Sequence, residues 1–149
     1  MEIKVLSRIQ PLSPFAGSQG FIGIAFRISE DNTAYESIYL RPKAGRSDSQ
    51  LVRNHTVQYY AYPDYKFDKL RKEEYMGQYE TYADIGLDEW ITMRIEFVGK
   101  TAKLYLNDQK YPAFIVNEIL GKSGSGTVGL WVDIGTEGYF KDLKILKTQ

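Results

Sequence analysis

The feature that most constrains the fold is a two-residue alternation of apolar and other side chains. Between residues 22 and 28, every second position is isoleucine or phenylalanine. Successive side chains of a β-strand point to opposite faces of a sheet, so this spacing predicts a strand with one buried face. The same alternation returns in residues 91–97 and 102–106, which flank a short glycine-bearing turn. We therefore expect β-strands to dominate, with a hairpin in the second half of the chain.

Glycine, proline and asparagine separate about ten such segments, and no long amphipathic helical pattern competes with them. Many short strands joined by tight turns are typical of two antiparallel sheets that share one core. A chain of 149 residues suits one core, since a domain of that size buries roughly 70% of the surface that its unfolded chain exposes. The sequence predicts an all-β, two-sheet antiparallel β-sandwich in which residues 1–149 form a single domain.

Charge and composition exclude several classes of partner. Nineteen basic residues balance nineteen acidic ones, so no global field recruits nucleic acid. No apolar run approaches the roughly 20 residues of a membrane helix, and we expect no membrane partner. The absence of cysteine excludes disulfides and thiolate metal sites. The first residues lack a signal-peptide pattern, which indicates a cytoplasmic protein as written, or an extracellular or periplasmic one if the N-terminus is truncated.

Aromatic and basic residues gather in one part of the sequence. In residues 34–41, two aliphatic side chains point one way, whereas Tyr39 and Arg41 point the other. Residues 53–71 then interleave the single histidine and four tyrosines with arginine and lysine. A sugar ring offers an apolar C–H face and a rim of hydroxyls, so aromatic rings beside planar hydrogen-bonding groups suit it. This part of the chain is therefore the candidate for a saccharide site.

Three segments resemble, in the same order, the strands of concanavalin A-like lectin and glucanase jelly rolls. They are GFIGIAFRISEDNTAYESIYLRP, DEWITMRIEFVGKTAKLYLND and GTVGLWVDIGTEGYFKDLKI, and the resemblance spans residues 3–145. The laminin-G-like and 3-keto-disaccharide-hydrolase-like domains are the nearest groups. The resemblance implies a jelly roll of two curved sheets, with carbohydrate bound on the concave sheet or at the loops along its rim.

The sequence departs from that family at two points. Family members usually have further strands before the one that EIKVLSR resembles, so the chain is expected to lack N-terminal strands and to present an open edge. An unpaired edge strand invites pairing with another chain, which predicts a homodimer through this edge. The laminarinase-like relatives use a Glu-x-Asp-x-x-Glu motif, and no such spacing occurs here. Carbohydrate binding without catalysis is therefore the leading hypothesis.

We expect the ligand-binding residues to lie around the concave face. They are Arg41, Arg53, Asn54, His55, Gln58, Tyr59, Tyr65, Arg71 and Trp131. A structural role is the alternative at each position, because tyrosine is a common strand residue. Arg41 or Arg71 would then brace a loop by pairing with Asp64, Asp68 or Glu80. The single histidine would then be a hydrogen-bonded structural residue rather than a base.

The enzymatic alternative is a glycoside hydrolase, or a sugar-processing lyase, in the same groove. Hydrolysis needs two carboxyl groups roughly 5 to 9 Å apart, and Glu80 and Asp133 are the candidates. His55 has the chemistry of a general base, but no serine or cysteine nucleophile forms a recognisable constellation with it.

Two further alternatives stay open. The aromatic surface would also suit a protein-interaction or adhesion module. No cofactor fingerprint or metal-ligand spacing is present, although the oxygen-rich loops at residues 30–32 and 133–137 have the chemistry for a structural Ca²⁺.

Overall fold

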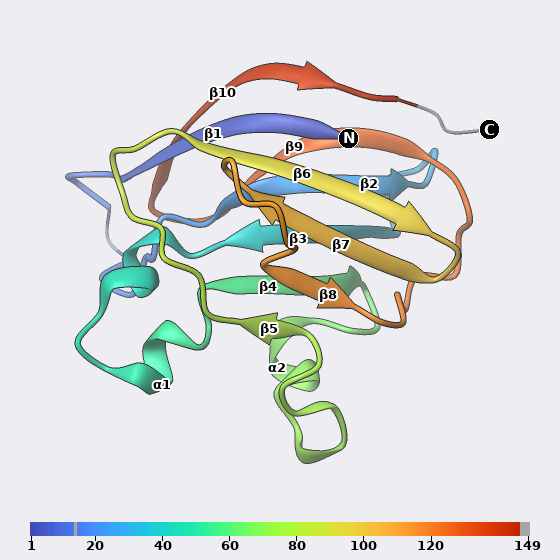
Figure 1. Ribbon diagram of the computed structural model, residues 1–149, viewed down its shortest axis with the longest axis horizontal. Coiled ribbons are helices and arrows are strands. Elements are labelled where there is room, and N and C mark those ends of the chain that lie inside the picture. The colour runs from blue at the N-terminus through green and yellow to red at the C-terminus, as the bar shows by residue number, and fades with distance from the viewer. Residues whose placement is uncertain (14, 147–149) are drawn as a thin grey trace.

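A computed structural model describes residues 1–13 and 15–146, in which ten strands form two five-stranded antiparallel sheets (Figure 1). Sheet A has the order β10 (Thr136–Lys144), β1 (Glu2–Ile9), β6 (Ile91–Val98), β7 (Thr101–Leu106), β8 (Phe114–Val116). Sheet B has the order β5 (Glu80–Thr81), β4 (Val57–Tyr62), β3 (Tyr35–Leu40), β2 (Ile22–Ile28), β9 (Thr127–Val132). The predicted all-β, two-sheet sandwich is confirmed.

The core lies between the two sheets and is built by the alternation seen in the sequence. Ile24 of β2 faces Ile38 of β3, and Ile38 faces Tyr59 of β4. From sheet A, Met93 and Leu104 add to the same cluster, and all five side chains are almost completely shielded from solvent. Burying a large apolar side chain stabilises a fold by roughly 1.5 to 3 kcal/mol, so these inward rows hold the layers together.

The predicted hairpin is present as β6 and β7, and the chain continues into β8 as a meander. Asn107 adopts a positive φ of 55° at the end of β7. Its side-chain oxygen accepts a hydrogen bond from the backbone N–H of Thr92 (3.0 Å), while its own N–H donates to the Thr92 carbonyl (2.9 Å). Asparagine tolerates the left-handed region, which explains why the turn occurs at this residue.

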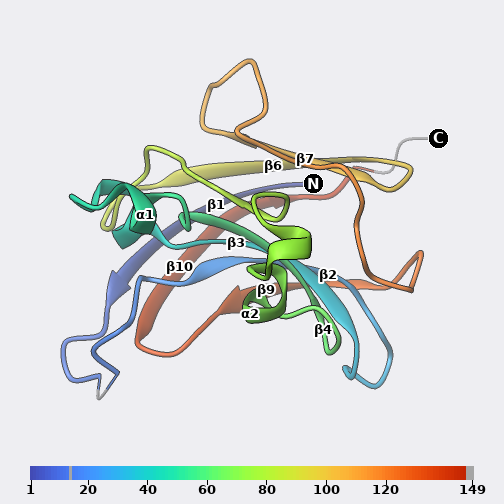
Figure 2. The ribbon, with the colours of Figure 1, turned by 90° about the horizontal axis from the view of Figure 1, so that it is seen from below.

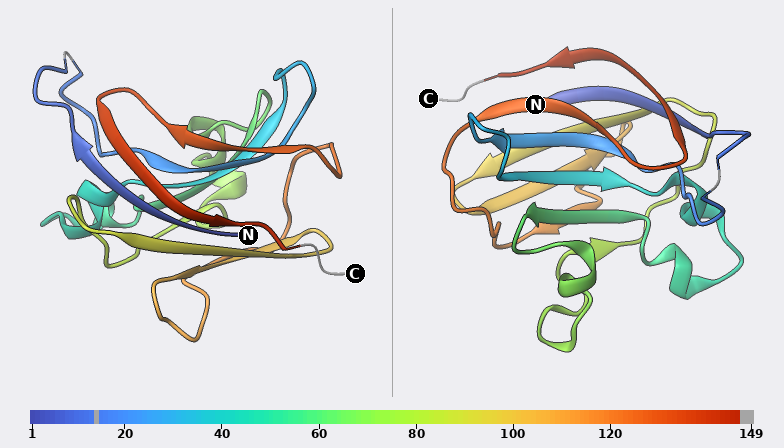
Figure 3. Two further views of the ribbon diagram at one scale, coloured as in Figure 1. Left: turned by 90° about the horizontal axis from the view of Figure 1, so that it is seen from above. Right: turned by 180° about the vertical axis from the view of Figure 1, so that it is seen from behind.

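The expected open N-terminal edge is not found. Strand β1 pairs with β10 on one side and with β6 on the other. The edges of the described sheets are instead β10 and β8 in sheet A, and β5 and β9 in sheet B, whose order can be followed from behind in Figure 3. A homodimer remains a prediction, but an unpaired β1 cannot be its route.

Short helical segments lie in two consecutive connections of sheet B, those that follow β3 and β4. They are η1 (Pro42–Arg46) and α1 (Gln50–Arg53) between β3 and β4, followed by α2 (Phe67–Leu70) and η2 (Glu73–Tyr75) between β4 and β5. Figure 2 shows the sheets as layers with α2 in front of them. No helix in the described part of the chain is long and apolar enough to cross a membrane. These connections bring side chains over the outer face of sheet B, the face turned away from the core.

Candidate functional site

The outer face of sheet B is lined with aromatic rings around one glycine. Gly23 of β2 lies between Tyr39 of β3 and Trp131 of β9 in the strand register. A Cβ atom at Gly23 would lie 2.7 Å from Cβ of Tyr39, which is too close for any other residue. The gap lets the rings of Tyr39 and Trp131 approach to 4.3 Å between centroids.

Hydroxyl groups connect these rings. The indole N–H of Trp131 donates to the hydroxyl of Tyr60 (2.8 Å), which lies 2.6 Å from the hydroxyl of Tyr35. Burial raises the pKa of Tyr60 well above its ordinary value and raises the pKa of Tyr39 to about 12. The rings therefore form a neutral, hydrogen-bonded floor rather than a set of loose surface tyrosines.

Arg41 lies at the end of this floor and is only 5% exposed. One terminal nitrogen, Nη1, donates to the backbone carbonyl of His55 (2.7 Å) and to Oε1 of Gln58 (3.2 Å), and Nη2 donates to the hydroxyl of Tyr39 (2.6 Å). Burial lowers the pKa of Arg41 from its usual value, yet these acceptors compensate the buried cation.

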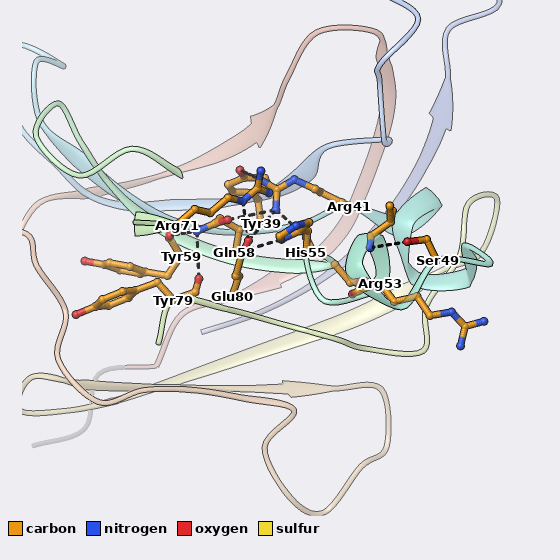
Figure 4. A network of polar contacts seen from close by, with 12 residues as sticks. Tyr39, Arg41, Ser49, Arg53, His55, Gln58, Tyr59, Arg71, Tyr79 and Glu80 are labelled. Atoms are coloured by element: carbon orange, nitrogen blue, oxygen red, sulfur yellow. Dashed lines mark hydrogen bonds and ion pairs between the residues drawn. The ribbon is translucent and has the colours of Figure 1, made fainter. Parts of the chain in front are cut away.

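Glu80 provides the negative charge next to the buried guanidinium group of Arg41 (Figure 4). Strand β5 pairs with β4 so that Glu80 stands opposite Gln58. Its Oε2 accepts from Nε of Arg71 (3.2 Å) and lies 3.9 Å from Nη1 of Arg41, and its Oε1 lies 2.9 Å from Nδ1 of His55. The His55 contact is short but not aligned as a hydrogen bond. A single carboxylate thus touches two guanidinium groups and an imidazole.

A pocket of about 360 Å³ opens beside this cluster, and we call it the Arg41 pocket. Four separate parts of the chain form its wall: the loop before β2, the segment from β3 to the start of β4, the helix α2 with its C-terminal cap, and the turn after β9. The lining residues are Phe15, Gln19, Phe21, Tyr39, Arg41, Ala44, Val52, His55, Phe67, Arg71, Asp133 and Ile134. The ring of Phe67 lies 5.7 Å from the guanidinium carbon of Arg41 and 5.1 Å from that of Arg71. The pocket therefore combines apolar rings with planar cationic donors.

Five of the nine predicted ligand-binding residues lie in or next to the pocket. Arg41, His55 and Arg71 line it directly. Gln58 is completely buried behind Arg41 and donates to the carbonyls of Tyr59 and Tyr79, so it supports the site without reaching the pocket. Trp131 packs against Tyr39 and supports the pocket from the side of β9.

Three predicted residues lie elsewhere. Nε of Arg53 donates to the carbonyl of Ser47 (2.6 Å), and Asn54 accepts from the side chain of Gln50 (2.8 Å), so both organise α1. Tyr65 packs edge-to-face on another tyrosine and lines two other surface depressions. None of the three lines the Arg41 pocket.

Tyr59 has to be removed from the predicted set, because it points into the core. Its hydroxyl donates to Oε1 of Glu36 (2.5 Å) and accepts from the backbone N–H of Leu120 (2.7 Å). Tyr59 directly follows Gln58 on β4, and neighbours on a strand face opposite sides. The two residues could not both have served the outer face.

The two candidate catalytic carboxylates differ in their surroundings. Oε2 of Glu80 contacts two guanidinium groups, Oε1 contacts the imidazole of His55, and the side chain is 12% exposed. Asp133 is exposed, lines the Arg41 pocket and accepts a hydrogen bond from the N–H of Ile134 (2.7 Å). The Glu80 carboxylate is thus occupied by its basic neighbours, whereas that of Asp133 faces solvent and forms no ion pair with any residue that the structure describes.

Most of the apolar residues that line the Arg41 pocket could not be identified from the sequence. Phe67 stands among the basic residues of the segment 53–71, and this was the only signal that pointed to it. Phe15, Phe21 and Ile134 come from loops whose convergence over sheet B follows from the tertiary fold alone.

Residues 1–13 and 15–146 contain no cluster of three or more histidine, aspartate or glutamate side chains that could hold a metal ion. In the loop at residues 30–32, Oδ1 of Asp31 instead accepts hydrogen bonds from Ser29 and Thr33.

Comparison with known families gives one match. The family model described as a 3-keto-alpha-glucoside-1,2-lyase-like domain matches residues 8–146, and this family has the concanavalin A-like β-sandwich fold. No significant match was found among curated proteins or among solved structures.

Proposed function

Because the chain belongs to the family of 3-keto-alpha-glucoside-1,2-lyase-like domains, a sugar-related family, we propose that it binds carbohydrate in the Arg41 pocket. The observation that carries the proposal is the junction of Phe67 with Arg41 and Arg71 in a pocket of about 360 Å³. Pockets for small ligands commonly fall between about 300 and 1,000 Å³ and pair apolar walls with a few polar groups.

The polar groups suit a saccharide. The terminal nitrogens of Arg71 make no hydrogen bond to any residue that the structure describes, and they remain free to donate to sugar hydroxyls. Asp133 adds an acceptor to the lining of the pocket, and Phe67, which is 45% exposed, offers a ring for the C–H face of a pyranose. Replacing one hydrogen bond to water by one to the protein gains only about 1 kcal/mol, so we expect dissociation constants in the micromolar to millimolar range.

The test is a glycan screen followed by replacement of the aromatic platform. Phe67→Ala should weaken binding of any hit by about tenfold or more, because stacking area is lost while the arginines stay. Tyr111→Ala is the matched control, since Tyr111 is an exposed aromatic residue on the connection between β7 and β8. Equal retention of a hit by Phe67→Ala and the unmodified chain would place the binding site elsewhere.

A second candidate function is elimination from a 3-keto glycoside, which the contact between His55 and Glu80 favours. A ketone at C3 acidifies the C2 proton. A base takes that proton, the C2–H electrons form a C1=C2 double bond, and the C1–O bond breaks to release the alcohol, which gains a proton. This reaction needs one base rather than a pair of carboxylates. His55 lines the pocket, and its Nδ1 lies next to the Glu80 carboxylate, so its imidazole is the candidate base.

The elimination is tested by following formation of the unsaturated ketone from a 3-keto-glucoside. His55→Gln should abolish turnover and keep binding of the substrate, whereas Asn54→Ala, one residue earlier and outside the pocket, should leave turnover unchanged. Turnover that survives in His55→Gln would exclude His55 as the base, and absence of turnover in the unmodified chain would leave binding as the function.

A further inference from the structure

The Arg41 pocket contains more positive than negative charge close to its base. Arg41 and Arg71 share Glu80 as their single ion-pair partner among the described residues. His55 approaches the same carboxylate. Asp133 also lines the pocket, but it is exposed to solvent and forms no ion pair with either arginine. Two guanidinium groups and one carboxylate leave about one positive charge unneutralised at a partly buried position.

The two guanidinium groups are close enough to repel each other. The positive charge of Arg71 acts on both Arg41 and the hydroxyl of Tyr39, and with burial it contributes to the lowered pKa of Arg41. Both groups also approach the same ring, Phe67. Like charges that are held together in a partly desolvated place attract an anion, because an anion relieves their repulsion.

The free donors have the shape that a carboxylate fits. Arg71 uses only Nε internally, which leaves the planar fork of Nη1 and Nη2. Arg41 uses Nη1 twice and Nη2 once, so one Nη2 hydrogen and the Nε hydrogen remain. A planar guanidinium fork pairs with the two oxygens of a carboxylate through parallel hydrogen bonds.

We infer that the saccharide bound in the Arg41 pocket carries a carboxylate group, as hexuronic acid units do. The carboxylate pairs with the free edge of Arg71 and is approached by Arg41, while the pyranose ring lies against Phe67. This inference rests on the proposed carbohydrate-binding function and adds the class of sugar. Glu80 then acts as a positioning residue that orients both guanidinium groups toward the ligand.

The test compares charged and neutral versions of the same sugar. Oligosaccharides of galacturonate, glucuronate and mannuronate are each titrated against the full chain by calorimetry, alongside their carboxyl-reduced, neutral counterparts. At least one uronate should bind about tenfold tighter than its reduced form, and added salt should weaken this preference. Equal affinity for all acid and reduced pairs would overturn the inference and leave carbohydrate binding in place. Failure of every saccharide to bind would overturn both proposals.

Variants assign the preference to the pocket. Arg71→Gln should reduce the preference for the acid form over the reduced form from about tenfold to less than about twofold, because the fork that pairs with the carboxylate is lost. Arg94→Gln is the matched control, because it removes one positive charge from sheet A outside the pocket, and it should leave the preference for the acid form unchanged. Retained preference in Arg71→Gln would contradict the role of the fork. Tighter competition by a sulfated disaccharide than by any uronate would assign the anion as a sulfate ester and overturn the carboxylate.

Discussion

Both sheets carry an arginine against a tyrosine ring on the outer face, but the two pairs have opposite surroundings. In sheet A, the guanidinium of Arg94 lies 4.2 Å from the ring centroid of Tyr105 and pairs with Glu96, with both charged side chains nearly half exposed. In sheet B, Arg41 lies 4.9 Å from the ring of Tyr39 and is almost completely buried. The two pairs have the same residue types, but Arg41 is shielded from water and Arg94 is not.

The difference comes from the segments that cover each face. The connections that contain α1 and α2, together with the loop before β2, close over the Arg41 end of sheet B. No pocket wall forms over Arg94 in the part of the chain that the structure describes, and its side chain stays nearly half exposed. The strands thus supply an arginine–tyrosine pair on each sheet. The covering segments enclose the pair of sheet B in a pocket, and the pair of sheet A stays on the open surface.

The largest expected difference between the two pairs is in stability. Arg41→Met should lower the free energy of unfolding by about 3 kcal/mol, because Glu80, Gln58 and the Tyr39 hydroxyl lose a buried donor. Arg94→Met should cost less than about 1 kcal/mol, as exposed ion pairs do. Denaturant unfolding of both variants measures this, and similar costs would mean that burial does not distinguish the two faces.

A smaller difference is expected from single hydroxyl groups. Tyr60→Phe removes the acceptor of the Trp131 indole and the partner of the Tyr35 hydroxyl, and should destabilise the chain by about 1 to 2 kcal/mol. Tyr105→Phe on sheet A is the control and should change stability by less than about 0.5 kcal/mol. If the two substitutions were equivalent, the hydroxyl network of sheet B would have no stabilising role.

The smallest expected effect concerns the ionisation of Tyr39 on the outer face of sheet B, and it cannot be observed at neutral pH. Burial holds the pKa of Tyr39 at about 12 in the folded chain, above the ordinary value of 10.0. A raised pKa gives no change below about pH 10, and stability is lost as pH rises through 10 to 12, because the unfolded chain releases the proton first. Tyrosinate absorbance at about pH 11 should therefore increase on unfolding. An identical titration curve for Tyr39→Phe would contradict this assignment.

The sequence predicted the sandwich because the two-residue alternation directly reports which side of each strand is buried. The same pattern placed Tyr39 and Arg41 on the outer face. The prediction that Gln58 and Tyr59 both bind ligand did not follow this alternation, because adjacent residues of a strand face opposite sides of the sheet. Tyr59 accordingly lies in the core. The sequence indicated Glu80 as one of three carboxylates that could pair with Arg41 or Arg71, but it could not choose among them, because the contact depends on a two-residue strand pairing across an irregular segment.

The pairing of β1 with β10 has a consequence for how the molecule is made. The first described strand gains its outer neighbour only when the last one has been synthesised, and Met1 meanwhile anchors to the backbone of Ile95, far along the sequence. Contacts of such long sequence separation slow folding. During synthesis one edge of β1 therefore has no partner strand until residues 136–144 have been made, and an unpaired strand edge exposed in this interval favours association with other chains.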